Sequence, residues 1–216
     1  MELQAKNVCK NIGDKIILEN VSLKLQQGNI YGFVGRNGSG KTMLFRALSG
    51  LMNISSGEIW WNNKLLHKDI KVLPNMGILL ENAGLYPELT GLDNLKLLAK
   101  LNQKVGEHEI RHAITRVGLD PKDKRTYRKY SLGMKQRIIL AQAIMEKPDI
   151  LMLDEPTNSL DEEGVELVRN IILEERTRGA MLLIASHNKD DIEQLADQVF
   201  EIKSGTIAKR VSKNEA

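Results

Sequence analysis

The fold of this chain is decided by residues 35–42, which read Gly35-Arg36-Asn37-Gly38-Ser39-Gly40-Lys41-Thr42. They match the pattern G-x-x-x-x-G-K-[ST], and residue frequencies give such a match by accident on the order of once in a hundred chains of this length. Glycines let the backbone wrap closely around an anion, with successive N–H groups pointing inward. A lysine here reaches the outer phosphates of ATP, and the threonine hydroxyl is a natural Mg²⁺ ligand. The sequence therefore predicts that residues 35–42 bind ATP, with Thr42 also binding Mg²⁺.

The residues on either side of this loop have the patterns that a phosphate site requires. Ile30–Val34 is a short apolar run typical of a buried strand. Met43–Gly50 has a helical pattern that begins at the loop and stops at a glycine. A strand, a glycine-rich loop and a helix in this order place the positive end of the helix next to the phosphates.

Farther out, strand and helix patterns alternate, which predicts an α/β fold with a largely parallel sheet, of the P-loop NTPase type. The first thirty residues indicate an antiparallel β subdomain. A helical block at about 82–135 interrupts the alternation, and we expect it to be a helical subdomain inserted into a single domain of residues 1–216. Further strands are expected at 57–61, 72–80, 150–153, 181–185, 199–202 and 206–211, and further helices at 109–117, 132–145, 163–178 and 190–196.

The composition excludes some classes of protein. The 31 basic and 28 acidic residues give a net charge of +3, which offers no argument for nucleic acid as a partner. A basic run at residues 122–129 is typical of a solvated loop, with contact to acidic lipid headgroups as the alternative. The lone Cys9 excludes an intramolecular disulfide. We expect no signal peptide, and no apolar stretch approaches the roughly 20 residues needed to cross a bilayer. We therefore expect a cytoplasmic protein.

Two acidic residues follow the apolar run Ile150–Leu153. Ligands of open α/β sheets bind at the carboxyl ends of the strands, where this run would deliver Asp154 and Glu155. Asp154 suits the shell of Mg²⁺, and Glu155 suits a base that polarises the attacking water. Two acids that cap a helix are the alternative, which the phosphate loop makes the weaker interpretation.

A histidine ends another apolar strand, at Ser186-His187. A histidine in this place is more often structural than catalytic. At the strand-end layer that holds the nucleotide, however, His187 can hydrogen-bond the γ-phosphate and the water. We therefore predict a catalytic role for it.

The run Tyr130-Ser131-Leu132-Gly133-Met134-Lys135-Gln136-Arg137 resembles the signature of the ATPase subunits of ABC transporters. The usual signature is Leu-Ser-Gly-Gly-Gln followed by Lys/Arg-Gln-Arg, and the resemblance extends over nearly the whole chain. It implies that Ser131 and Gly133 bind the phosphate of an ATP held by a second ATPase subunit, in a head-to-tail dimer. It also implies that Asn158–Asp161 contacts that second subunit.

The sequence departs from the family at three places. Ile12 stands where the family usually stacks an aromatic ring on adenine, and Glu81 stands where it usually has a glutamine that contacts Mg²⁺ and the water. Leu132 and Met134 replace a glycine and a glutamine of the signature. The last two departures are shared by a branch that resembles the ATPases of bacitracin and lantibiotic exporters, so we interpret them as marks of lineage.

The resemblance also implies a membrane partner. The segment Glu81–Thr90, with Leu85-Tyr86-Pro87, corresponds to the region that receives the coupling helix of a membrane subunit. An ordinary turn with buried apolar residues is the alternative. We therefore expect an ATPase that drives transport, in the direction of export, from the inner face of the membrane. A soluble ABC-type ATPase with a regulatory role is the alternative function.

Overall fold

The computed structural model describes residues 1–80 and 84–212, and the side chains of residues 189–191 are not part of the description. Within these residues, six strands form a central sheet in the order β10-β9-β3-β8-β7-β6. The strands from β9 to β6 run parallel, and β10 is antiparallel to β9. Their bounds are Ile30–Val34 (β3), Met76–Leu79 (β6), Ile150–Asp154 (β7), Met181–Ser186 (β8), Gln198–Lys203 (β9) and Thr206–Ser212 (β10).

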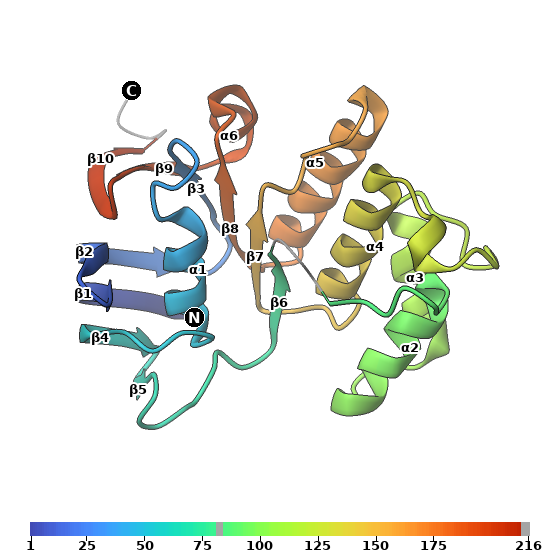
Figure 1. Cartoon of the computed structure of the whole chain (residues 1–216), viewed down its shortest axis with the longest axis horizontal. Helices are drawn as coiled ribbons and strands as arrows, with labels where there is room; N and C mark the ends of the chain where they lie inside the picture. Colours follow the sequence, from blue (N-terminus) through green and yellow to red (C-terminus); the bar gives the residue numbers. More distant parts are fainter. Residues whose placement is uncertain (81–83, 213–216) are drawn as a thin grey trace.

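An antiparallel sheet in the order β2-β1-β4-β5 covers one side of the molecule (Figure 1). Its strands are Glu2–Ile12 (β1), Lys15–Gln26 (β2), Ser56–Trp61 (β4) and Lys64–Leu65 (β5). The β1–β2 hairpin turns at Gly13-Asp14 and pairs Ile12 with Lys15. This sheet confirms the antiparallel β subdomain expected from the first thirty residues, and it also includes β4 and β5 from later in the chain.

The helices lie on both faces of the central sheet. Figure 1 shows α1 between the two sheets and the remaining helices on the far side of the central strands. Their bounds are Lys41–Ser49 (α1), Gly91–Asn102 (α2), Glu107–Arg116 (α3), Leu132–Ile144 (α4), Glu162–Thr177 (α5) and Lys189–Leu195 (α6), with a 3₁₀ turn at Tyr127–Lys129 (η1). The helical block thus contains α2, α3 and η1, and its limits at about 82–135 stay a prediction.

Two hydrophobic cores fill the space on either side of the central sheet. Along β7, Ile150 and Met152 join the core under α1, whereas Leu151 and Leu153 join the core under α4 and α5. Successive side chains of a strand point to opposite faces, so a strand covered on both faces is apolar throughout. This explains the uninterrupted apolar runs in the sequence.

One strand is shorter than the sequence predicted. The pattern at 72–80 indicated a strand, but β6 begins only at Met76. Pro74 precedes it and has no N–H group for a strand ladder, and the side chain of Val72 is exposed. The paired part, Met76–Leu79, aligns with Ile150–Leu153 of β7.

Candidate functional site

The phosphate loop joins β3 to α1 at the carboxyl edge of the central sheet. Gly40 has φ +110°, a left-handed conformation that favours glycine, and it is the N-cap of α1 without any side-chain hydrogen bond. The first N–H groups of α1 therefore have no side-chain cap and face the loop. Gly205 of the β9–β10 turn donates its N–H to the Ser39 carbonyl at 2.8 Å, so this turn is hydrogen-bonded to the loop.

Lys41 folds back across the loop that it ends. Its ammonium group donates to the Gly35 carbonyl at 2.7 Å and lies 3.6 Å from Oε1 of Glu155. The residue is only 6% exposed. A buried cation beside this loop attracts anions strongly, because the protein interior screens charge less than water does.

Thr42 and Asp154 meet although 112 positions separate them in the chain. The Thr42 hydroxyl donates to Oδ2 of Asp154 at 2.5 Å. Both groups are hard oxygen donors at the strand-end edge, the type of ligand that Mg²⁺ prefers. In the described part of the chain, no group of three or more His, Cys, Asp or Glu side chains could hold a metal ion. Mg²⁺ commonly binds through one or two protein ligands together with phosphate oxygens, which this pair fits.

Glu155 has an unusual backbone conformation. Its φ is +50°, which is left-handed and costs a non-glycine residue roughly 1–2 kcal/mol. Its N–H donates to the Ala185 carbonyl at 2.8 Å, and its own carbonyl accepts from Gln136 Nε2 at 2.9 Å and from the Asn158 N–H at 3.2 Å. Strained residues of this kind cluster at active sites, where the surrounding structure holds them.

The two carboxylate oxygens of Glu155 have different surroundings. Oε2 lies 2.9 Å from Nδ1 of His187 and accepts from the Ser186 hydroxyl at 3.3 Å. Oε1 receives no hydrogen bond from the residues that the structure describes. One oxygen is therefore bonded to groups at the end of β8, and the other is buried 3.6 Å from the Lys41 ammonium group. The strand order brings these residues together, because β8 lies between β3 and β7.

A cavity of about 620 Å³ lies over the phosphate loop. Its lining includes Lys41, Thr42, Asp154 and Glu155. It also includes residues from the start of β2 and from the β9–β10 turn, at Lys15-Ile16-Ile17 and Ser204-Gly205.

The apolar residues of the β1–β2 hairpin differ in their relation to this cavity. Ile16 lines it and is 56% exposed. Ile12 is 53% exposed and does not appear in the lining that the described residues form. The structure therefore adds Ile16 to the candidates for a contact with the base, next to the predicted Ile12.

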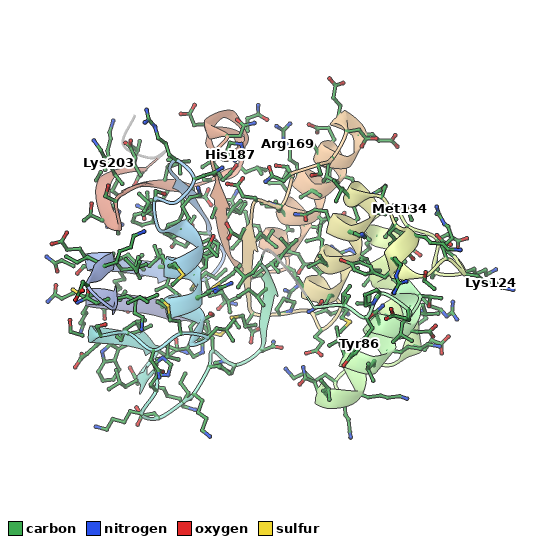
Figure 2. All side chains as sticks on the ribbon, viewed as in Figure 1. Tyr86, Lys124, Met134, Arg169, His187 and Lys203 are labelled. Atoms are coloured by element: carbon green, nitrogen blue, oxygen red, sulfur yellow. The ribbon has the colours of Figure 1, made fainter. Side chains whose placement is uncertain are left out.

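The signature residues begin α4. The Ser131 hydroxyl caps this helix by accepting from the Met134 N–H at 3.2 Å. Neither Ser131 nor Gly133 belongs to the described lining of the cavity over the loop. Figure 2 shows Met134 on one side of α5 and His187 on the other. Within one chain, then, Ser131 and Gly133 stay outside the described lining over the phosphate loop, although Gln136 of the same run bonds the Glu155 carbonyl.

The described part of the segment predicted to meet a membrane subunit is hydrogen-bonded to α2. Leu85 is buried, whereas Tyr86 is 56% exposed and lies beside α2 (Figure 2). The buried Asn94 side chain accepts from the Tyr86 N–H at 2.7 Å and donates to the Tyr86 carbonyl at 3.0 Å. Glu81, the predicted Mg²⁺ ligand, lies outside the described residues, as do Asn82 and Ala83.

Part of the basic run at 122–129 pairs with acids. Arg125 binds Asp123 at 2.7 Å, and Arg128 forms an ion pair with Glu88. The Arg128 N–H also donates to the Pro87 carbonyl at 3.0 Å, so this run is attached to the Tyr86 segment.

Sequence reasoning assigned no role to two residues that contact Glu155. Ser186 ends the same strand as His187, so its strand-end position was an available signal. In the sequence, Gln136 is distinguished only as a residue of the signature run. Nothing in the sequence indicated that its side chain reaches the Glu155 carbonyl, because that contact depends on how α4 packs against β7.

Comparison with known proteins gives consistent matches. The sequence profile described as ABC transporter matches residues 18–158. The chain is 45% identical over 205 residues to the ABC transporter ATP-binding protein YybJ of Bacillus subtilis (strain 168), covering 95% of this chain and 94% of that protein. It is 34% identical over 215 residues to the bacitracin transport ATP-binding protein BcrA of Enterococcus faecalis, covering 99% of this chain and 70% of that protein.

The fold has a counterpart among solved structures. The dimeric structure of MJ0796, a bacterial ABC transporter cassette, matches with a TM-score of 0.88 and 21% identity, covering 97% of this chain and 98% of that one. At this identity the likeness concerns the fold alone. It confirms the predicted P-loop fold with its two sheets and added helices.

Proposed function

The chain belongs to the ABC transporter family, as an ATP-binding and ATP-hydrolysing subunit, and we propose that the residues around Lys41 and Glu155 carry out the hydrolysis. The observation that carries this proposal is the convergence of three strand ends. β3 provides the phosphate loop, β7 provides Asp154 and Glu155, and β8 provides Ser186 and His187. A base, a cation and a set of N–H groups then surround one point.

In this proposal the loop N–H groups of residues 35–42 and the Lys41 ammonium hold the phosphates of ATP. Oε1 of Glu155 accepts a proton from water as the water oxygen bonds to the γ-phosphorus. The bond to the bridging oxygen breaks, and ADP and phosphate form. Lys41 stabilises the negative charge on the leaving phosphate oxygens. His187 orients Glu155 through Nδ1, and its other ring nitrogen is assigned to the γ-phosphate, as the sequence predicted.

Mg²⁺ is assigned to Thr42 and Asp154, whose oxygens lie 2.5 Å apart. Glu81 keeps its predicted place in this shell as part of the proposal. When bound, Mg²⁺ neutralises charge on the β- and γ-phosphates. The protein contributes the position of the two oxygen ligands, which the β7 strand end and the first turn of α1 hold.

A complete site requires a second subunit in this proposal. Ser131 and Gly133 begin α4 outside the cavity lining of their own chain, as a head-to-tail dimer requires. Each subunit would then place its signature on the ATP of the other, with Asn158–Asp161 at the contact. ATP closes this pair and hydrolysis opens it.

The Glu155→Gln variant tests this arrangement. The amide cannot accept the proton from water, so ATP should bind and persist. We expect a stable dimer with saturating ATP, measured by light scattering after size-exclusion chromatography. Adding Lys41→Met to the same variant should abolish the dimer. A Glu155→Gln protein that stays monomeric with ATP and with the membrane partner present would contradict the proposal.

We assign the exposed Tyr86 segment to a membrane subunit, with the chain held on the cytoplasmic face by that partner. Among the described residues, no helix is long and apolar enough to cross a membrane. Bacitracin transport is the activity in the name of BcrA, and peptide export is the function we assign to this chain by that resemblance.

The Tyr86→Ala variant tests the docking surface. Asn94 bonds the backbone N–H and carbonyl of Tyr86, so loss of the tyrosine ring should leave the segment in place. We expect about tenfold weaker co-purification with the membrane subunit and basal ATP hydrolysis within twofold of the wild type. Leu51→Ala, at another exposed apolar residue, serves as the control. Equal losses in both variants would remove Tyr86 from the docking surface.

A further inference from the structure

The carboxylate of Glu155 can act only if its backbone stays in the left-handed conformation. With φ at +50°, this conformation is disfavoured for glutamate and needs outside support. A relaxation of φ would swing the side chain away from Ser186 and His187. The groups that bond the Glu155 peptide units therefore control the aim of the carboxylate.

One side chain provides such support. Gln136 Nε2 donates to the Glu155 carbonyl at 2.9 Å across 19 positions of sequence. Among the described residues, the other bonds to the N–H and the carbonyl of Glu155 come from backbone groups of Ala185 and Asn158. Gln136 and Glu155 also line one small cavity of about 320 Å³, together with Leu79 and Asn158. The amide is thus held at the site rather than in solvent.

Helix α4 carries Gln136 and packs closely on the loop that follows Glu155. A Cβ added to Gly133 would lie 3.1 Å from the Ser159 carbonyl, so a larger residue would push this turn away. Ser159 is itself left-handed, with φ +64°. The segment from Glu155 to Ser159 is therefore strained at both ends and lies against the first turns of α4.

We propose that Gln136 is a positioning residue for ATP hydrolysis, which holds the Glu155 peptide so that its carboxylate faces the attacking water. This inference rests on the proposed function, because it assumes that Glu155 is the base. It adds a route within one chain from the signature helix to the base. Ser131 begins α4, and Gln136 lies one turn later, so a shift of α4 would alter the bond to Glu155.

The test compares Gln136→Met and Gln136→Glu with the wild type. Both variants keep the length of the side chain and its helix propensity, and both lose the donor. Gln142→Met is the matched control, because Gln142 is a partly buried glutamine on the same helix. The measurements are kcat and KM for ATP under single- and multiple-turnover conditions, and the melting temperature.

We expect kcat to fall about tenfold in both Gln136 variants, with KM within about twofold of the wild type. Gln142→Met should retain wild-type kcat. A purely structural role would instead lower the melting temperature and affect KM and kcat together. A wild-type kcat in both Gln136 variants, or an equal loss in Gln142→Met, would overturn the inference.

A double-mutant cycle with Glu155→Gln distinguishes a failure of the positioning role of Gln136 from a failure of the proposed function. If Gln136 acts through Glu155, Gln136→Met should lower the residual turnover of Glu155→Gln by less than twofold. A further tenfold loss in that background would overturn the positioning role. Wild-type turnover in Glu155→Gln alone would overturn the proposed function and this inference with it. If the Gln136 variants keep wild-type turnover while Glu155→Gln loses it, only this inference is overturned.

Discussion

Two parts of the lining of the cavity over the phosphate loop are built in different ways. The first part consists of buried residues beside the ends of central strands, where Lys41 is 6% exposed and Glu155 is 7% exposed. The second part comes from the start of β2, where Ile16 is 56% exposed, and from the β9–β10 turn. The parallel sheet supports the first part, and the exposed start of a hairpin strand belongs to the second.

This difference indicates which part of ATP, the phosphates or the adenine base, contributes more to the binding free energy. Charged phosphates interact most strongly with N–H groups and a cation that are fixed and shielded from water. An exposed aliphatic side chain offers a base only partial burial of apolar surface, worth roughly 25 cal/mol for each Å². We therefore infer that ATP is held mainly by its phosphates, and that the base contributes less.

Lys41→Met is the substitution for which the comparison predicts the largest effect. It removes the cation while keeping an aliphatic chain of similar length. We expect kcat/KM for ATP hydrolysis to fall by about 10²–10³-fold, as measured by phosphate release. Lys15→Met, which removes a cation from the part of the lining that β2 contributes, is the control and should change kcat/KM by less than about threefold. Equal losses would contradict the contrast between the two parts of the lining.

Thr42→Val should have an intermediate effect. The substitution keeps the shape of the side chain and removes the hydroxyl that lies 2.5 Å from Asp154 Oδ2. We expect the Mg²⁺ concentration for half-maximal hydrolysis to rise about tenfold, since one oxygen ligand is lost. Thr42→Ser keeps the hydroxyl and should restore the wild-type value. An unchanged Mg²⁺ requirement in Thr42→Val would remove Thr42 from the metal shell.

The smallest effects are expected at the apolar residues of the β1–β2 hairpin that are candidates for a contact with adenine. Ile16→Ala should raise KM for ATP about fivefold with little change in kcat, because a contact of this kind stabilises substrate and transition state equally. Ile12→Ala should raise KM by less, since Ile12 is absent from the described cavity lining. Titrations of both variants with ATP measure the difference. A larger effect at Ile12 would return the base contact to the position that the sequence predicted.

Much of the fold could be predicted from local patterns. The apolar runs at Ile30–Val34 and Ile150–Leu153 became buried strands, because strands covered on both faces carry no polar alternation. The start of β6 could not be predicted in the same way. Val72 continues an apolar pattern, but Pro74 interrupts the hydrogen bonding that a strand needs.

The sequence by itself was enough to predict which groups bind phosphate, because glycines, a lysine and a helix start need only eight consecutive residues to form an anion site. It also determined the family, through the run at 130–137. Only the tertiary structure decided that β8 lies between β3 and β7 and sets Ser186 and His187 against Glu155. It likewise decided that Gln136 reaches the Glu155 carbonyl. Strand order and helix packing depend on contacts between residues far apart in the chain, and no local pattern records them.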